Sequence, residues 1–425
     1  MDYTALHRHL GRRSGPVDDE LLNAAVDANL RETDDLDWKL KLPSMKVLGK
    51  TDFPKDVAAF ANAGGGTIVY GVEEDDMAAE KRVDIGDCTE ADVRTMISVA
   101  ASHIHPPVLG LRVHRLAASS KHAVVVVVPP SLDQPHLILC DHQRFGAPLR
   151  NGADTRWMSE REIAERYRQR FAEQRIANDV LDQLYDDATA WPGPRDRAWG
   201  IAVARPRIPL PSGLSRDDAR RLIYDGRATA ARMLRKAYDT PLDAVDANSL
   251  RHGLRRWTAR PKGSTNAPYH QARANLHHDG SVTLAAALGG HPDKIQNELP
   301  GSHFESWRLE VLVADFMNLL KAVGDHMGGF EFDVRLGIDW DQGEALLIEA
   351  LDFAGYRNEG VSQPLNRYAP VDATVTLQTD AEGFLQQTRE FATDCINQGG
   401  VPELVAMKTT MEERAGSVIR GISDR

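Results

Sequence analysis

The most specific part of the sequence runs from residue 32 to residue 73. It opens with ETDDLDWK (residues 32–39) and closes with FANAGGGTIVYGVE (residues 60–73). Apolar residues alternate with charged ones from Leu36 to Leu42, and a period of two predicts a half-buried strand. This alternation places Asp37 and Lys39 together on the polar face of that strand. A second strand is predicted over TIVYGV, residues 67–72.

A helix is predicted between these two strands. Thr51 or Asp52 can cap it, Pro54 suits its first turn, and the glycines at 64–66 end it. Glycine-rich loops also cradle phosphates, but this one follows a helix and lacks Gly-Lys-Ser/Thr, so a helix end is the better interpretation. Further along we expect a helix over 89–104, strands over 111–116, 123–128 and 144–150, and a long helix over 159–185.

The length of 425 residues predicts two or three domains. We expect an α+β protein. A helical lead-in covers residues 1–30, and a domain with a mixed sheet and flanking helices covers 31–187. A linker with two prolines and a glycine covers 188–197. Residues 198–425 are predicted to form a C-terminal α/β domain of unknown type, with a regulatory or partner-binding role. We expect a long helix over 304–323 there, and a hairpin over 330–351.

Composition excludes several classes of protein. The chain is 42% hydrophobic and 27% charged, which is ordinary for a folded globular protein. No apolar run approaches the roughly 20 residues of a transmembrane helix. No signal peptide is evident, and the three cysteines lie far apart, so we expect a cytoplasmic protein without a disulfide framework. The net charge of -11 means that any nucleic-acid surface must be local.

Acidic residues gather near the ends of the two predicted strands. Asp37 projects from the polar face of the first strand, and Glu73 lies just past the end of the second. If the strands are neighbours, these carboxylates converge, and Glu32 can reach them. Three carboxylates form a hard-oxygen site suited to Mg²⁺ or Mn²⁺. The alternative is that these acids are ordinary surface residues near strand ends.

This pattern resembles the AlbA_2 domain of the Schlafen family. The motif begins with two acids five positions apart, which precede an aromatic residue and a lysine. FAN-x-x-GG comes next, then a strand that ends in GV plus an acid, and finally RNGADT at 150–155. In nuclease members of that family a three-carboxylate metal site cleaves RNA. The resemblance assigns this site to Glu32, Asp37 and Glu73, with Lys39 neutralising the scissile phosphate. The family usually has Glu as the second acid and Asp as the third, whereas this chain has Asp37 and Glu73. The acids at 74–76 are alternatives to Glu73 as the third acid.

Basic residues near this site are candidate phosphate contacts, or else a solvated face of the strand and its loop. They are Lys39, Lys41, Lys46, Lys50, Arg144, Arg150 and Arg156.

The resemblance implies a metal-dependent endoribonuclease that acts on structured RNA, above all tRNA, as a phage-defence effector. The excess of Arg over Lys fits a bacterial, GC-rich genome. Nuclease cores of that family join two related lobes, so by this resemblance a single copy of the motif implies a homodimer or larger homo-oligomer. The alternative is a non-catalytic transcriptional regulator that binds DNA or RNA, in which the carboxylates pair with the lysines.

Overall fold

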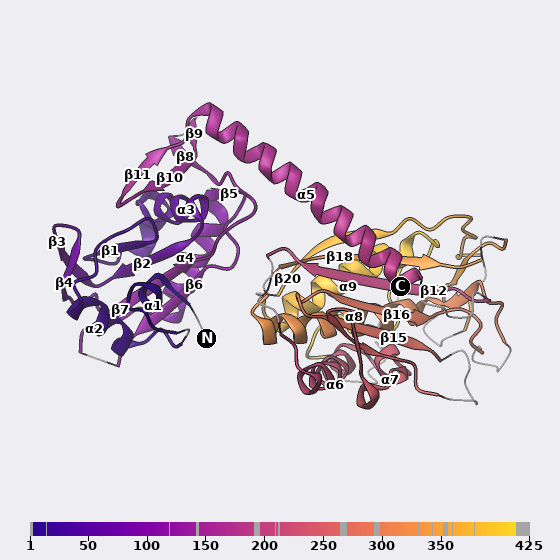
Figure 1. Ribbon diagram of the computed structural model, residues 1–425. Helices are drawn as coiled ribbons and strands as arrows, with labels where there is room; N and C mark the ends of the chain where they lie inside the picture. Colours follow the sequence, from indigo (N-terminus) through magenta and orange to yellow (C-terminus); the bar gives the residue numbers. More distant parts are fainter. Residues whose placement is uncertain are drawn as a thin grey trace, which may run out of the picture. The chain divides into compact units, whose positions relative to one another are not determined.

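A computed structural model describes the chain as two compact units, Met1–Arg175 and Ile176–Arg425 (Figure 1). The described residues are 3–13, 15–118, 120–141, 144–190, 196–208, 210, 213–263, 270–292, 298–329, 331–341, 343–351, 356–358, 360–377 and 379–413.

The N-terminal unit is built on a mixed sheet. In its described residues, β1 (Leu36–Lys39) runs parallel to β2 (Gly66–Tyr70), with Asp37 opposite Ile68. β7 (Ala123–Val128) is antiparallel to β2, and β6 (Arg112–Leu116) is antiparallel to β7. The order β1-β2-β7-β6 confirms the predicted mixed sheet, and the two motif strands, β1 and β2, are neighbours.

Helices cover both faces of this sheet. One face packs Trp38, Val69 and Val125 against α1 (Ala5–His9) and α2 (Asp19–Asp27). The other face packs Ile68 and Val126 against α3 (Phe53–Ala63) and α4 (Glu90–His103). Because helices lie on both sides, β1 is buried along nearly its whole length, and the prediction of a half-exposed strand is wrong.

Short strands complete the N-terminal unit. The predicted strand over 144–150 is divided into β9 and β10, with Ala147 between them. The remaining short elements are η1 (Met45–Lys50), β3 (Val72–Asp75), β4 (Ala78–Arg82), β5 (Ile104–His105), β8 (Leu137–Asp141), β9 (Arg144–Gly146), β10 (Pro148–Asn151) and β11 (Asp154–Trp157).

The end of α3 fixes the FAN-x-x-GG motif in place. Gly64 and Gly65 have φ values of 102° and 91°, a left-handed conformation that glycine adopts without strain. A Cβ on Gly65 would lie 2.7 Å from the backbone nitrogen of Pro130. The fully buried Asn62 donates to the carbonyls of His136 and Pro148 at 2.9 and 2.8 Å, and accepts from the His136 amide at 2.8 Å. Asn62 therefore ties α3 to the segments leading into β8 and β10.

The helix α5 (Glu160–Thr189) runs from the N-terminal unit into the C-terminal one. It ends within the predicted linker at 188–197, of which residues 191–195 lie outside the described part of the chain. None of the described helices has the length and apolar character needed to span a membrane.

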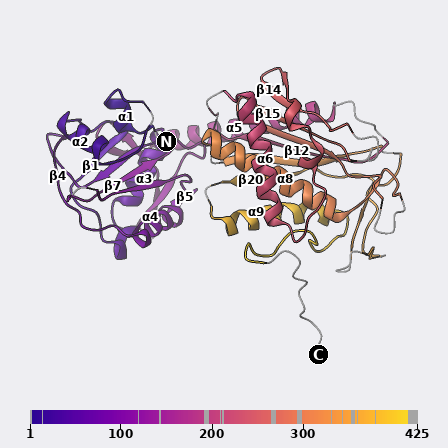
Figure 2. The ribbon, with the colours of Figure 1, turned by 90° about the horizontal axis from the view of Figure 1, so that it is seen from below.

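The C-terminal unit is built on an antiparallel sheet, with seven strands in its described residues. The order is β13 (Arg251–Gly253), β14 (Arg256–Ala259), β15 (Ala272–His277), β16 (Val282–Ala287), β12 (Trp199–Pro206), β18 (Glu331–Asp339) and β20 (Val371–Thr376). One face packs against α6 (Arg216–Met233), α7 (Pro241–Ala244), α8 (Ser306–Met327) and α9 (Ala381–Asn397), as the views in Figures 1 and 2 show.

The opposite face of that sheet holds a smaller apolar cluster under the end of α5. Leu181 of α5 packs there with Trp199, Ile201 and Val203 of β12. The predicted hairpin over 330–351 is wrong, because β18 pairs with β12 and β20, whereas β19 (Leu347–Glu349) pairs in parallel with β17 (His303–Glu305). A 3-10 turn, η2 (Ala247–Ser249), precedes β13.

The role of Asn62 leads to a stability prediction. Asn62→Ala leaves three buried backbone groups without their partner, which costs about 2–4 kcal/mol in unfolding free energy. We expect scanning calorimetry to show the N-terminal unit melting roughly 5–10 °C lower. The exposed Asn151→Ala is the matched control and should stay within about 0.5 kcal/mol of the parent. Equal melting temperatures for the two variants would contradict the assignment.

Candidate functional site

Asp37 lies at the centre of a buried charge cluster in the N-terminal unit. Its side chain is only 2% exposed. Nη1 of Arg150 lies 3.1 Å from Oδ1, and Nζ of Lys39 lies 2.8 Å from Oδ2. Both carboxylate oxygens therefore contact a cation supplied by the chain itself.

Arg150 comes from β10 and is fixed by three further features. It is 7% exposed, its guanidinium carbon lies 4.8 Å from the centroid of the Phe60 ring, and Nη2 donates to the Thr33 carbonyl at 3.3 Å. The turn after β10 places Gly152 at a φ of 64°, where its amide donates to the Asp34 carboxylate. The RNGADT segment thus closes over the ETDDLDWK segment.

Lys39 carries the exposed part of the cluster, because 38% of its side chain is accessible. Its ammonium also lies 3.9 Å from the Asp56 carboxylate. Burial lowers the pKa of Lys39, but the carboxylates of Asp37, Asp56 and Glu32 outweigh burial and raise it above its ordinary value. Lys39 is therefore charged at neutral pH.

Sequence reasoning missed Asp56. It is 5% exposed, and burial raises its pKa to about 6, against the opposing effect of Lys39. The available signal was its position as the one acid in the mostly apolar helix FPKDVAAFANA (residues 53–63).

Glu32 approaches the cluster from the segment before β1. Its Oε1 accepts the Trp38 amide at 2.8 Å. Burial raises the pKa of Glu32 to about 7, and the charges of Asp37 and Glu74 add to this effect, while the Trp38 hydrogen bond and Arg150 oppose it. Glu32 therefore titrates near neutrality.

Glu73 points elsewhere. It lies opposite Lys81 in the β3–β4 hairpin, with Oε2 3.0 Å from the lysine Nζ. A register shift between Glu73 and Glu74 changes which side chains of β3 share a face. In this hairpin it is the charge of Glu74 that raises the pKa of Glu32. The structure brings together Glu32, Asp37 and Lys39, and it places Glu73 in an ion pair of its own.

The architecture around these residues matches a known domain. A family model described as Schlafen, AlbA_2 matches residues 32–159, which include the cluster and both segments that close it.

The N-terminal unit contains a Schlafen AlbA_2 domain.

Two solved structures show distant likeness to the chain. The DIP2311 protein from Corynebacterium diphtheriae is 15% identical, with a TM-score of 0.25, covering 50% of this chain and 33% of that one. The N-terminal domain of a putative ATP-dependent DNA helicase RecG-related protein from Nitrosomonas europaea is 23% identical, with a TM-score of 0.23, covering 32% of this chain and 88% of that domain. Comparison with curated proteins gives no match. These likenesses are too distant to carry a functional inference.

The predicted metal ligands Glu32, Asp37 and Glu73 are not brought together as one set in this arrangement. Among the described residues, no three His, Cys, Asp or Glu side chains form a group that could hold one. Asp37 already contacts Lys39 and Arg150, and Glu73 contacts Lys81. A cation placed at Asp37 would sit beside two positive side chains, which is electrostatically unfavourable.

The predicted phosphate contacts fall into three groups. Lys41, Lys46 and Lys50 are exposed, and the described part of the chain shows no ion pair to any of them. Lys39 and Arg150 neutralise Asp37, while Arg156 forms an ion pair with Glu162 at 2.6 Å. The side chain of Arg144 lies outside the described residues.

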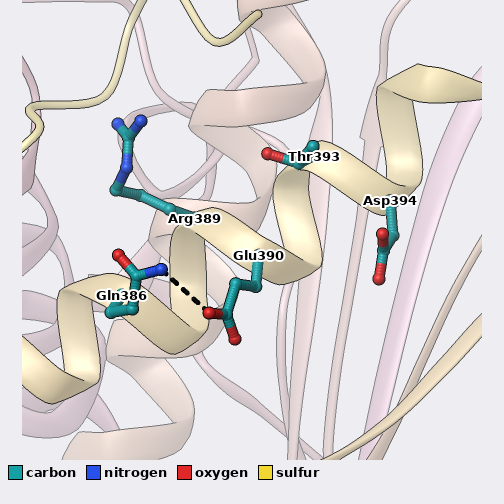
Figure 3. A pocket seen from close by; sticks show the side chains of 5 residues that line it. All are labelled: Gln386, Arg389, Glu390, Thr393 and Asp394. Atoms are coloured by element: carbon teal, nitrogen blue, oxygen red, sulfur yellow. Dashed lines mark hydrogen bonds between the residues drawn. The ribbon is translucent and has the colours of Figure 1, made fainter. Parts of the chain in front are cut away.

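A hollow in the C-terminal unit lies on the outer surface of α9 (Figure 3). Gln386 donates to Glu390 at 2.8 Å along the helix. Arg389 is held by the carbonyls of Met407 and Lys408 at 3.3 and 2.6 Å. Gln386, Arg389 and Glu390 therefore make contacts within the fold. The residues that line the hollow are Gln386, Arg389, Glu390, Thr393 and Asp394.

The raised pKa of Glu32 predicts a pH-dependent stability. The folded chain holds the Glu32 proton more tightly than the unfolded chain, so this contribution is present at low pH and is lost as pH rises through about 7. Glu32→Gln keeps an acceptor for the Trp38 amide but cannot ionise. We therefore expect the melting temperature of the variant, relative to the parent, to rise between pH 5 and 8. A pH-independent difference would show that Glu32 titrates normally.

Proposed function

We propose that the N-terminal unit binds structured RNA through the lysines that follow β1. Lys41, Lys46 and Lys50 carry this proposal, because they are exposed and are not neutralised by any ion pair in the described residues. Exposed lysines without an ion pair favour binding to a phosphate backbone, because they replace and release its counterions. The Schlafen AlbA_2 match independently relates this unit to nucleic acid.

In this proposal the buried cluster organises the binding surface. Asp37 neutralises Arg150, which closes β10 over β1, and it fixes Lys39 at the start of the segment that carries the three exposed lysines. The side chain of Lys39 is 38% exposed, so it can also contact a phosphate while it remains paired with Asp37. This arrangement favours the alternative drawn from the sequence, in which the carboxylates pair with basic residues.

The overall charge favours a selective ligand. A chain with a net charge of -11 repels a long polyanion except where basic residues are concentrated. A folded RNA such as tRNA presents a compact phosphate surface to one such region, whereas a duplex-coating protein is usually basic throughout. We therefore take tRNA as the first ligand to test.

A second candidate is metal-dependent cleavage of structured RNA. One observation favours it: Glu32 has a pKa of about 7 beside Asp37 and Glu74. A carboxylate that titrates near neutrality in an acidic cluster is typical of catalytic sites. For this candidate, Mg²⁺ or Mn²⁺ would have to bind carboxylates that contact Lys39 and Arg150 in the structure.

The test uses the full chain and total bacterial tRNA, with Mg²⁺, with Mn²⁺ and with EDTA, examined on native and denaturing gels. We expect a retarded, uncut complex in all three conditions. The triple variant Lys41→Gln/Lys46→Gln/Lys50→Gln should weaken it and reduce the slope of log K against log salt by about 2, at roughly 0.7 per lost contact. The matched control neutralises three exposed arginines elsewhere in the unit, Arg13, Arg94 and Arg161.

Three outcomes would change this conclusion. Discrete RNA fragments that require metal and disappear in Asp37→Asn would establish the nuclease instead of the binder. A complex with duplex DNA but none with tRNA would contradict the choice of RNA. Equal affinities for the lysine variant and its control would contradict the assigned surface.

A further inference from the structure

Four arginines gather on one face of the sheet in the C-terminal unit. Arg251 of β13 lies opposite Thr258 of β14, and Thr258 lies opposite Asn275 of β15. Directly paired residues of antiparallel strands share a face, as do residues two apart along a strand. Arg256 and Arg260 flank Thr258 at this spacing, and Arg273 flanks Asn275. We call Arg251, Arg256, Arg260 and Arg273 the arginine face.

The arginine face lies on the side of the sheet that also contacts α5. Nη1 of Arg256 lies 3.7 Å from Oδ2 of Asp187 near the end of that helix. The apolar contacts of α5 are with β12 and β16, at Trp199, Ile201, Val203, Ala285 and Ala287. The arginine face occupies the neighbouring strands β13, β14 and β15, beside the part of the sheet that α5 packs against.

The strands beneath the arginine face are held by a buried chain of hydrogen bonds. The Thr258 hydroxyl donates to Asn275 Oδ1 at 2.8 Å, and Asn275 Nδ2 donates to the Thr283 hydroxyl at 2.7 Å. All three side chains are buried, at 5%, 7% and 3% exposure. A satisfied polar chain of this kind fixes β14, β15 and β16 in register and so holds the two strands that carry Arg256 and Arg273.

The positive charges of the arginine face act on one another, although Asp187 pairs with Arg256. Arg251 and Arg260 are exposed, whereas Arg256 and Arg273 are partly buried. Burial lowers the pKa of the Arg273 guanidinium, and the positive charges of Arg256 and Arg260 lower it further. Like charges on one face repel, so an anion that binds there relieves repulsion in addition to its own contacts.

We propose that the arginine face binds the phosphodiester backbone of a nucleic acid. Guanidinium groups bind phosphate oxygens through paired hydrogen bonds. Arg256 and Arg260 are four residues apart in sequence, or about 13 Å along an extended strand, and two neighbouring strands carry the other arginines. This spread suits several phosphates of one strand better than a single phosphate group. The proposal rests on other residues than the lysines assigned to RNA binding.

The test measures tRNA binding by the full chain, using fluorescence anisotropy across a salt series. The variant Arg251→Gln/Arg260→Gln neutralises the two exposed members, so the fold is retained. We expect a several-fold loss of affinity and a salt slope lower by about 1.4, at roughly 0.7 per contact. The control Arg220→Gln/Arg232→Gln removes two exposed charges from α6, on the opposite side of the sheet. Equal affinity and slope for the arginine variant and the control would overturn the proposal.

Two further arms separate this proposal from the other one. The lysine triple variant is measured in parallel. If only the arginine variant loses tRNA affinity, the result supports the arginine face and not the lysine surface. If only the lysine variant loses tRNA affinity, the proposal for the arginine face is overturned. Inorganic phosphate and ATP are the second arm. If either binds in an arginine-dependent manner while tRNA affinity is unchanged by the arginine variant, the ligand is a small phosphate compound and the nucleic-acid assignment is wrong.

Discussion

The burial of the Asp37 carboxylate between Lys39 and Arg150 is the constraint on which the N-terminal unit depends. A carboxylate removed from water costs several kcal/mol unless cations and hydrogen bonds compensate it. At 2% exposure, Asp37 meets this requirement through two ion pairs. One is with Lys39, 2 positions away, and the other is with Arg150, 113 positions away. Arg150 in turn contacts the Phe60 ring and the Thr33 carbonyl. One acid thereby links β1, α3 and β10, the elements that carry the sequence motif.

This constraint explains the motif as a set of structural requirements. Asn62 binds the backbone on either side of β8, and Gly64 and Gly65 provide the left-handed turn into β2. Arg150 supplies the charge that Asp37 needs. The motif residues therefore hold β1, α3 and β10 together in the interior, whereas Lys41, Lys46 and Lys50 nearby are exposed.

Much of the N-terminal fold could be predicted from the sequence, because local patterns determine it. The period of two around Asp37, the glycines after Asn62 and the apolar run of β7 each define an element without reference to distant residues. The burial of Asp37 could not be predicted, since alternation is equally compatible with a solvated face. The direction of Glu73 depends on a register shift inside a hairpin. The predicted 330–351 hairpin failed because β18 pairs with strands distant in sequence, a choice that local periodicity does not encode.

Asp37 forms ion pairs with Lys39 and Arg150, and we propose that it serves as their counterion and not as a metal ligand. The most direct measurement is the melting temperature of the N-terminal unit by scanning calorimetry, with and without Mn²⁺. A bound ion at a hundred times its Kd would add about 2.7 kcal/mol of stability. We expect no Mn²⁺-dependent change in the melting temperature. An increase that is lost in Asp37→Asn would show that Asp37 is a metal ligand and would contradict it.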